Sequence, residues 1–132
     1  MIVGDTQAVV WYLEANGRLG PEARDRIARA IQNGEAAFSA ISIWEIGMLQ
    51  QKGRLSNDMN AAQWHERLLA EGFNEIPVTG AIAARASSLL DMHGDPADRI
   101  VVATALEGHL LITSDGPILN WPHRLDRFPA TR

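Results

Sequence analysis

Residues 95–115, DPADRIVVATALEGHLLITSD, contain the pattern that decides the fold. Asp95 and Pro96 are residue types that cap and begin a helix, and Gly108 is typical of the position that ends one. The segment 109–115 that follows is mostly apolar and ends on a polar turn, which predicts a strand. A helix that leads directly into a strand is the unit from which α/β proteins are built.

The rest of the chain repeats this alternation of helical and extended segments. Because strands that alternate with helices form βαβ units, the pattern predicts an α/β fold with three layers. We expect a mainly parallel central sheet of four to five strands with helices on both faces, in a single domain over residues 1–132. Besides the helix over 95–108, the predicted helices span 6–17, 19–35, 41–55, 60–73 and 79–90. The predicted strands span 2–5, 36–40, 74–78, 109–115 and 124–128.

The composition excludes several classes of protein. Cysteine is absent, so disulfides and thiolate metal sites are excluded. A net charge of −4 argues against a protein that binds nucleic acid through a basic surface alone. The chain opens without a signal sequence and has no apolar run long enough to span a membrane, so we expect a cytoplasmic protein with no membrane association.

Two of the predicted strands end on an aspartate, where the chain leaves the core. Asp5 follows the first strand, and Asp115 follows the strand LLITS. In an open parallel sheet, ligands bind beyond the carboxyl ends of the strands, near the point where the strand order reverses. Each aspartate taken alone is equally consistent with an ordinary turn residue.

Two of the predicted helices carry an acid in their first turn. In SIWE, Ser42 and Glu45 match the capping-box pattern, and Asp95 and Asp98 have the same spacing in DPAD. Such acids satisfy backbone N–H groups and favour the positive end of the helix dipole, which contributes about 1 kcal/mol. Capping alone therefore explains Glu45 and Asp98 when each is considered separately.

The combination of these acids favours a metal site. Helix starts follow strand ends in an α/β fold, so both kinds of acid are expected to converge on one edge of the sheet. Carboxylates brought together repel one another unless cations are present. Oxygen ligands suit Mg²⁺ or Mn²⁺, and such a site suits the hydrolysis of phosphodiester bonds. Zinc is disfavoured, because cysteine is absent and the histidines show no short ligand spacing.

The order of four short motifs resembles the PIN-domain family, and more narrowly the VapC-type ribonuclease toxins of bacterial toxin–antitoxin pairs. The motifs are DT at 5–6, WE at 44–45, DPADRIVVATAL at 95–106 and ITSD at 112–115. No single motif is specific, but their order and spacing extend the resemblance from residue 2 to about residue 128.

The resemblance implies an endoribonuclease, a hydrolase in which a metal-activated water cleaves RNA and leaves a 5′-phosphate and a 3′-hydroxyl. Thr6 would support Asp5 through its hydroxyl group. Asp95 would be a helix cap or an outer ligand of the ion. The catalytic residues, which would also hold Mg²⁺ or Mn²⁺, are the four acids Asp5, Glu45, Asp98 and Asp115.

The resemblance also implies partners. These are an RNA substrate, a cognate antitoxin protein that blocks the acidic pocket, and a second copy of the chain in a homodimer. Two roles are open for Arg99, which either holds an RNA phosphate or an acidic partner residue, or forms an intramolecular ion pair. Thr113 and Ser114 are candidates for orienting Asp115 by hydrogen bonds. Gln7 stands where relatives often carry histidine or serine, so we expect this departure to affect substrate contacts and not metal binding.

We expect the tryptophans and His93 to have structural roles. The helical positions of Trp11, Trp44 and Trp64 predict core packing. Trp121 lies in a loop flanked by prolines and is expected to be exposed. We expect His93 to be an ordinary loop residue.

Other classes of protein are alternatives to a nuclease. A phosphoaccepting receiver domain would need paired acids after the first strand and a lysine at a later strand end, but Gly4 precedes Asp5 and Lys52 lies elsewhere. The serine hydrolase elbow and the phosphate-binding P-loop are both absent. A PIN-fold binding or regulatory module without activity stays open, and metal-dependent RNA cleavage separates it from a nuclease.

Overall fold

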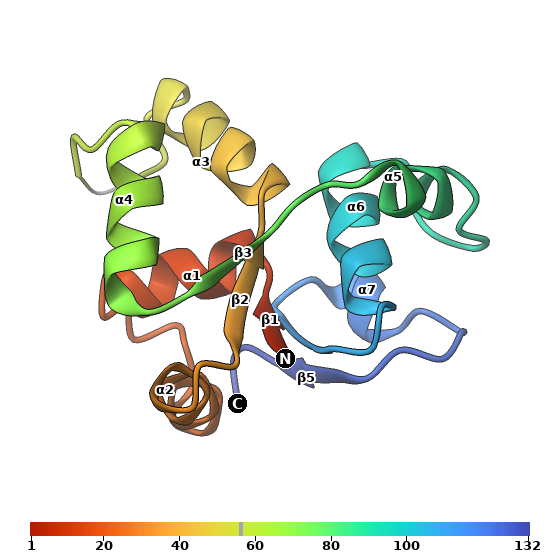
Figure 1. Ribbon diagram of the computed structural model, residues 1–132, viewed down its shortest axis with the longest axis horizontal. Coiled ribbons are helices and arrows are strands. Elements are labelled where there is room, and N and C mark those ends of the chain that lie inside the picture. Colours follow the sequence, from red (N-terminus) through yellow and green to blue (C-terminus); the bar gives the residue numbers. More distant parts are fainter. Residues whose placement is uncertain (56) are drawn as a thin grey trace.

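A computed structural model describes residues 1–55 and 57–132 (Figure 1). Its centre is a five-stranded sheet with the order β3-β2-β1-β4-β5, in which every neighbouring pair is parallel. The strands are β1 (Ile2–Gly4), β2 (Ala36–Ser39), β3 (Asn74–Ile76), β4 (Leu110–Thr113) and β5 (Arg127–Pro129). The helices are α1 (Thr6–Leu13), α2 (Pro21–Gln32), α3 (Ile41–Gln51), α4 (Ala61–Glu71), α5 (Gly80–Ser87), α6 (Pro96–Ala105) and α7 (Gly116–Leu119).

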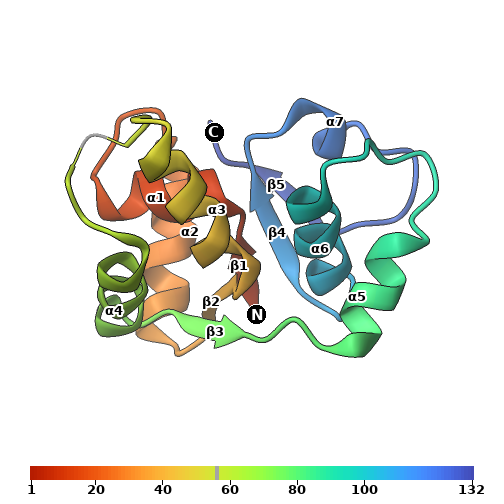
Figure 2. The ribbon, with the colours of Figure 1, turned by 90° about the horizontal axis from the view of Figure 1, so that it is seen from above.

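Helices cover both faces of the sheet, so the predicted three-layer α/β architecture is confirmed. Figure 2 shows α1, α2, α3 and α4 on one side of β1 and β4, and α5, α6 and α7 on the other. Successive strand residues point to opposite faces. Accordingly, Ile112 packs into the core beneath α1, α2 and α4, whereas Val3 and Leu111 pack into the core beneath α6 and α7. Burial on both faces explains why the strand sequences are continuously apolar.

The chain between β4 and β5 differs from the prediction. Residues 116–123 were expected to form a loop, but Gly116–Leu119 form the short helix α7, and Pro117 occupies its first turn. Strand β5 begins at Arg127, because its pairing with β4 starts opposite Leu111. Trp121 is buried here and donates from Nε1 to the carbonyl of Leu90 (2.8 Å), so its expected exposure was wrong.

Three large apolar side chains are exposed, and the predicted core packing of Trp44 is therefore wrong. Trp44 is 57% exposed, because it lies about 200° around α3 from the buried residue Ile46. Leu90 is 69% exposed, because α5 ends at Ser87 and Leu90 lies beyond it. Leu69 is exposed beside the buried Leu68 of α4.

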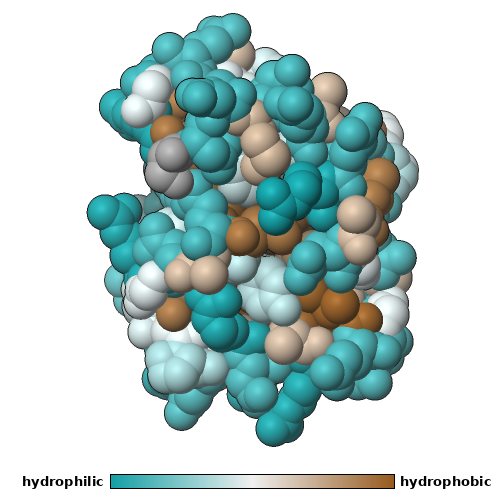
Figure 3. Space-filling view, turned by 90° about the vertical axis from the view of Figure 1, so that its left-hand side faces the viewer, coloured by the Kyte–Doolittle hydropathy of each residue, from teal (hydrophilic) through white to brown (hydrophobic). Residues whose placement is uncertain are grey.

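Figure 3 shows the face of the molecule that carries α2, α3 and α4. The face formed by α2, α3 and α4 is mostly hydrophilic, with small apolar areas between the polar side chains (Figure 3). Within residues 1–55 and 57–132, none of the helices has both the length and the apolar character that crossing a membrane requires.

Arg99 of α6 anchors the loop that joins α5 to α6. Its guanidinium donates to four backbone carbonyls, those of Ala86 (2.9 Å), Leu89 (3.0 Å), Met92 (3.0 Å) and His93 (3.2 Å). The expected intramolecular ion pair is not formed among the described residues, because the group faces the chain's own backbone. Arg99 fixes the loop that carries His93 and Asp95.

We expect Arg99→Met to lower the free energy of unfolding by about 2–4 kcal/mol, because it leaves several carbonyls without a donor. Arg85→Met is the matched control, since among the described residues Arg85 makes a single long contact with a carbonyl (3.4 Å), at the surface. Urea unfolding monitored by circular dichroism measures both variants. Equal losses in the two variants would contradict the anchoring role.

Candidate active site

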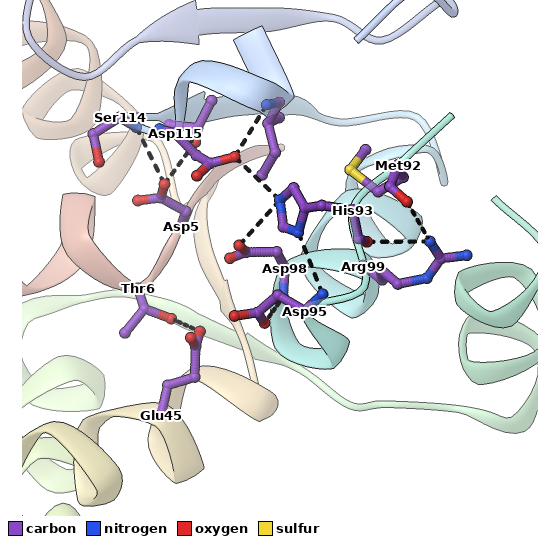
Figure 4. Close-up of polar contacts among 12 residues, drawn as sticks. Asp5, Thr6, Glu45, Met92, His93, Asp95, Asp98, Arg99, Ser114 and Asp115 are labelled. Atoms are coloured by element: carbon purple, nitrogen blue, oxygen red, sulfur yellow. Dashed lines mark hydrogen bonds and ion pairs between the residues drawn. The ribbon is translucent and has the colours of Figure 1, made fainter. Parts of the chain in front are cut away.

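The predicted acids gather where the strand order of the sheet reverses. From β1 the chain proceeds outward through β2 and β3 on one side, and through β4 and β5 on the other. In parallel sheets this reversal leaves a crevice beyond the carboxyl ends of the two central strands. Asp5 directly follows β1, and Asp115 comes two residues after the end of β4. Figure 4 shows these side chains together with the acids of α3 and α6.

Asp5 is the most tightly held carboxylate of the site. Oδ1 accepts from the backbone N–H of Ala8 (2.8 Å), which makes Asp5 the N-cap of α1. Oδ2 accepts from the Thr113 hydroxyl (2.6 Å) and from the Ser114 N–H (3.2 Å). Burial raises the pKa of Asp5, and the negative charge of Asp115 raises it further. The three hydrogen bonds oppose this rise. Asp5 is only 8% exposed, so its carboxylate is held at the edge of the sheet.

The Thr6 hydroxyl does not support Asp5 as expected, whereas the Thr113 hydroxyl forms the expected hydrogen bond with Asp115, through the backbone of that residue. Thr6 hydrogen-bonds with Glu45 and not with Asp5, and its oxygen also lies 2.9 Å from the hydroxyl of Ser42. Thr113 donates to Asp5, while its oxygen accepts from the backbone N–H of Asp115 (3.0 Å). Each hydroxyl therefore connects two elements of the site.

Glu45 lies in the second turn of α3 and not in a capping box. Residue Ala40 is the N-cap, with helical backbone angles and no side-chain bond, so the expected cap by Ser42 is wrong. Ser42 is instead buried inside the helix and contacts Thr6. Burial raises the pKa of Glu45, the bond from Thr6 opposes this, and the nearby Asp95 and Asp5 raise it further. The carboxylate therefore faces other acids and not its own backbone.

The start of α6 separates the roles of its two aspartates. Asp95 Oδ1 accepts from the N–H of Asp98 (3.1 Å), which confirms the expected cap. A full capping box would return the Asp98 side chain to the N–H of Asp95. That N–H instead donates to Nδ1 of His93 (3.3 Å). Asp98 is therefore not needed for capping.

The Asp98 carboxyl has a strongly perturbed protonation equilibrium. Burial raises its pKa to about 7, the negative charges of Asp95, Asp115 and Glu45 contribute further, and His93 opposes them. A carboxyl with this pKa is about half protonated at neutral pH. Among the residues that the structure describes, no arginine or lysine forms an ion pair with Asp98.

All four predicted acids line one cavity. Its volume is about 200 Å³, and it is lined by Asp5, Thr6, Gln7, Glu45, Asp98, Ser114, Asp115 and Gly116. Asp95, Arg99 and Thr113 do not line it. A larger hollow beside α2, of about 560 Å³, is lined by both arginines and acids, so opposite charges offset one another there. The small acidic cavity is the site where chemistry is most strongly favoured.

The donor atoms of the site suit a hard cation. Two groups each offer three ligand atoms that lie within 4.8 Å of one another, one from Glu45, Asp95 and Asp98 and the other from His93, Asp98 and Asp115. All but the histidine nitrogen are carboxylate oxygens, the ligands that Mg²⁺ and Mn²⁺ prefer. Asp98 belongs to both groups, so an ion near it would relieve the repulsion that raises its pKa.

His93 is the site residue that the sequence did not identify. Its Nε2 lies 3.4 Å from both Asp98 Oδ2 and Asp115 Oδ2. A signal was present, because His93 stands two residues before the N-cap Asp95 and five before Asp98. Only the fold of the α5–α6 loop brings its ring to Asp115, which is distant in the sequence.

Comparisons with known proteins show which proteins the chain resembles. Ribonuclease VapC22 of Mycobacterium tuberculosis is 32% identical over 121 residues, which cover 90% of each chain. A toxin–antitoxin complex from Klebsiella pneumoniae has a similar fold (TM-score 0.63, 19% identity, 98% of each chain covered). So does VapBC2 from Rickettsia felis bound to a promoter DNA fragment (TM-score 0.70, 14% identity, 98% of each chain covered). A family model of the PIN domain matches residues 2–119. The chain therefore belongs to the PIN-domain family.

Proposed function

We propose that the protein is a metal-dependent endoribonuclease that acts as the toxin of a toxin–antitoxin pair. The observation that carries the proposal is the cavity in which Asp5, Glu45, Asp98 and Asp115 meet. Three of these acids, Asp5, Glu45 and Asp98, have raised pKa values, which is typical of a site that awaits a cation. The similarity to Ribonuclease VapC22 supports RNA as the substrate.

In this proposal the four acids hold Mg²⁺ or Mn²⁺, and their carboxylate oxygens fit either ion. When bound, the ion activates a water for attack on phosphorus and offsets the negative charge of the phosphodiester. Hydrolysis then leaves a 5′-phosphate and a 3′-hydroxyl on the two RNA products.

The chain's own residues would orient these acids. Three hydrogen bonds fix Asp5 at the sheet edge, so its carboxylate needs little reorganisation to bind an ion. Thr6 holds Glu45 toward the cavity. The cap made by Asp95 sets the direction of α6 and thereby places Asp98.

The partners follow from the same reasoning. The solved structures with this fold are described as a toxin–antitoxin complex and as VapBC2 on promoter DNA, which supports a cognate antitoxin for this chain. An arginine of that antitoxin would be attracted by the excess of carboxylates in the cavity. We further propose that the protein acts as a homodimer, because one small acidic domain offers little surface for RNA. Its proposed location is the cytoplasm.

Asp5→Asn tests the nuclease directly. We expect it to reduce cleavage of total cellular RNA in Mg²⁺ or Mn²⁺ by about a hundredfold or more, because it removes a fixed charge at the centre of the site. EDTA should abolish cleavage by the wild type. Asp126→Asn is the control, since Asp126 is exposed and precedes β5, at the opposite edge of the sheet. Activity that survives both EDTA and Asp5→Asn would refute the proposal.

The protonation of Asp98 gives a second prediction. Its pKa in the metal-free fold is about 7, whereas an unfolded chain would have an ordinary value near 3.8. The folded state therefore binds the proton more tightly, and metal-free stability falls as the pH rises from about 4 to about 7. We expect Asp98→Asn to stabilise the protein in EDTA by about 2 kcal/mol at pH 8 and by little near pH 4.

Urea unfolding at several pH values measures this difference, again with Asp126→Asn as the control. If Asp98→Asn changed the free energy of unfolding equally at every pH, the raised pKa of Asp98 would be contradicted. In the wild type, Mn²⁺ affinity should rise between pH 6 and pH 8, because the ion displaces the Asp98 proton.

A further inference from the structure

His93 joins two acids that come from different parts of the fold. It lies in the loop between α5 and α6, and its ring stands between Asp98 of α6 and Asp115 of the β4–α7 turn (Figure 4). Nε2 is 3.4 Å from Oδ2 of each carboxylate, and the geometry toward Asp115 is that of a long hydrogen bond. A single ring nitrogen is thus shared between the two acids.

The hydrogen bond on the opposite side of the ring determines where the imidazole proton lies. The backbone N–H of Asp95 donates to Nδ1 (3.3 Å). A nitrogen that accepts a hydrogen bond carries no proton, so in the neutral ring the proton lies on Nε2. His93 therefore presents an N–H donor to the carboxylates of Asp98 and Asp115.

The position of the ring separates His93 from the residues that face the cavity. Asp98 and Asp115 line the acidic cavity, whereas His93 does not. Asp115 Oδ2 also accepts from the N–H of Ile118 (3.0 Å). Within residues 1–55 and 57–132, Oδ1 of Asp98 and Oδ1 of Asp115 accept no hydrogen bond, so these atoms remain available for a ligand.

We propose that His93 is a positioning residue, whose Nε2–H fixes Oδ2 of Asp98 and of Asp115 and so aims both carboxylates into the cavity. This inference rests on the proposed metal-dependent function. Groups behind the ligands of an ion commonly orient them, and their loss weakens metal binding by about 10- to 100-fold. The same ring accepts the Asp95 N–H, so one side chain fixes both the helix start and the acids.

Two substitutions separate positioning from a merely structural role. His93→Asn can keep an acceptor near the position of Nδ1 but loses the donor at Nε2. His93→Gln can keep a donor near Nε2 but loses the acceptor for Asp95. His123→Asn is the control, since His123 pairs with Asp91 (2.8 Å) at the surface, away from the cavity.

We expect His93→Asn to weaken Mn²⁺ binding by about 10- to 100-fold in calorimetry, with a similar loss of RNA cleavage, while the urea midpoint in EDTA is unchanged. His93→Gln should restore Mn²⁺ affinity to within about threefold of the wild type, although its urea midpoint falls. His123→Asn should leave Mn²⁺ binding unchanged. Equal Mn²⁺ affinity in the wild type and both His93 variants, or better binding by the Asn than by the Gln variant, would overturn the positioning role.

Electron spin echo measurements on the Mn²⁺-loaded wild type provide an independent check. We expect no strong coupling from a directly bound histidine nitrogen, and such a coupling would make His93 a ligand and overturn the inference. Because Mn²⁺ binding is measured without RNA, a wild type that binds Mn²⁺ but cleaves no RNA would refute the nuclease alone. A wild type that binds no Mn²⁺ would contradict both.

Discussion

The structure depends on placing several carboxylates at one edge of the sheet, where they repel one another. Asp5 bears this constraint most directly, since it is buried at the end of β1 and has no cationic partner among the described residues. Three hydrogen-bond donors from α1 and from the end of β4 hold it in place. The cost of this arrangement appears in the raised pKa values of Asp5, Glu45 and Asp98. A divalent cation bound there would remove that cost.

Helix capping and the candidate metal site use the same residues without conflict. Asp5, Asp95 and Asp115 each accept a backbone N–H at the start of a helix, so the chain fixes these side chains before any ion binds. Asp98 differs from these three. A longer side chain at position 98 would accept the backbone N–H of Asp95, as in a full capping box, but His93 accepts that N–H instead. The short aspartate therefore stays free to face the cavity. Preorganisation of this kind lets a small domain maintain a cluster of like charges.

Much of the fold could be predicted from the sequence, because the strands are short apolar runs buried on both faces and most helices begin with recognisable caps. The four acids could be brought to one edge because helix starts follow strand ends in a parallel sheet. Other features depend on tertiary contacts that local patterns do not contain. Arg99 reaches the carbonyls of a loop that only the packing of α5 on α6 creates. Trp121 is buried because the α7 turn, itself missed, directs it toward Leu90.

Anomalous diffraction from crystals soaked in Mn²⁺ would test the central claim, that the converging carboxylates form a site for a divalent cation. The account predicts a peak inside the cavity lined by Asp5, Glu45, Asp98 and Asp115, with carboxylate oxygens at about 2.1 Å from the ion. Nε2 of His93 should lie outside that coordination distance. An empty cavity at saturating Mn²⁺, or a peak elsewhere on the molecule alone, would contradict the account.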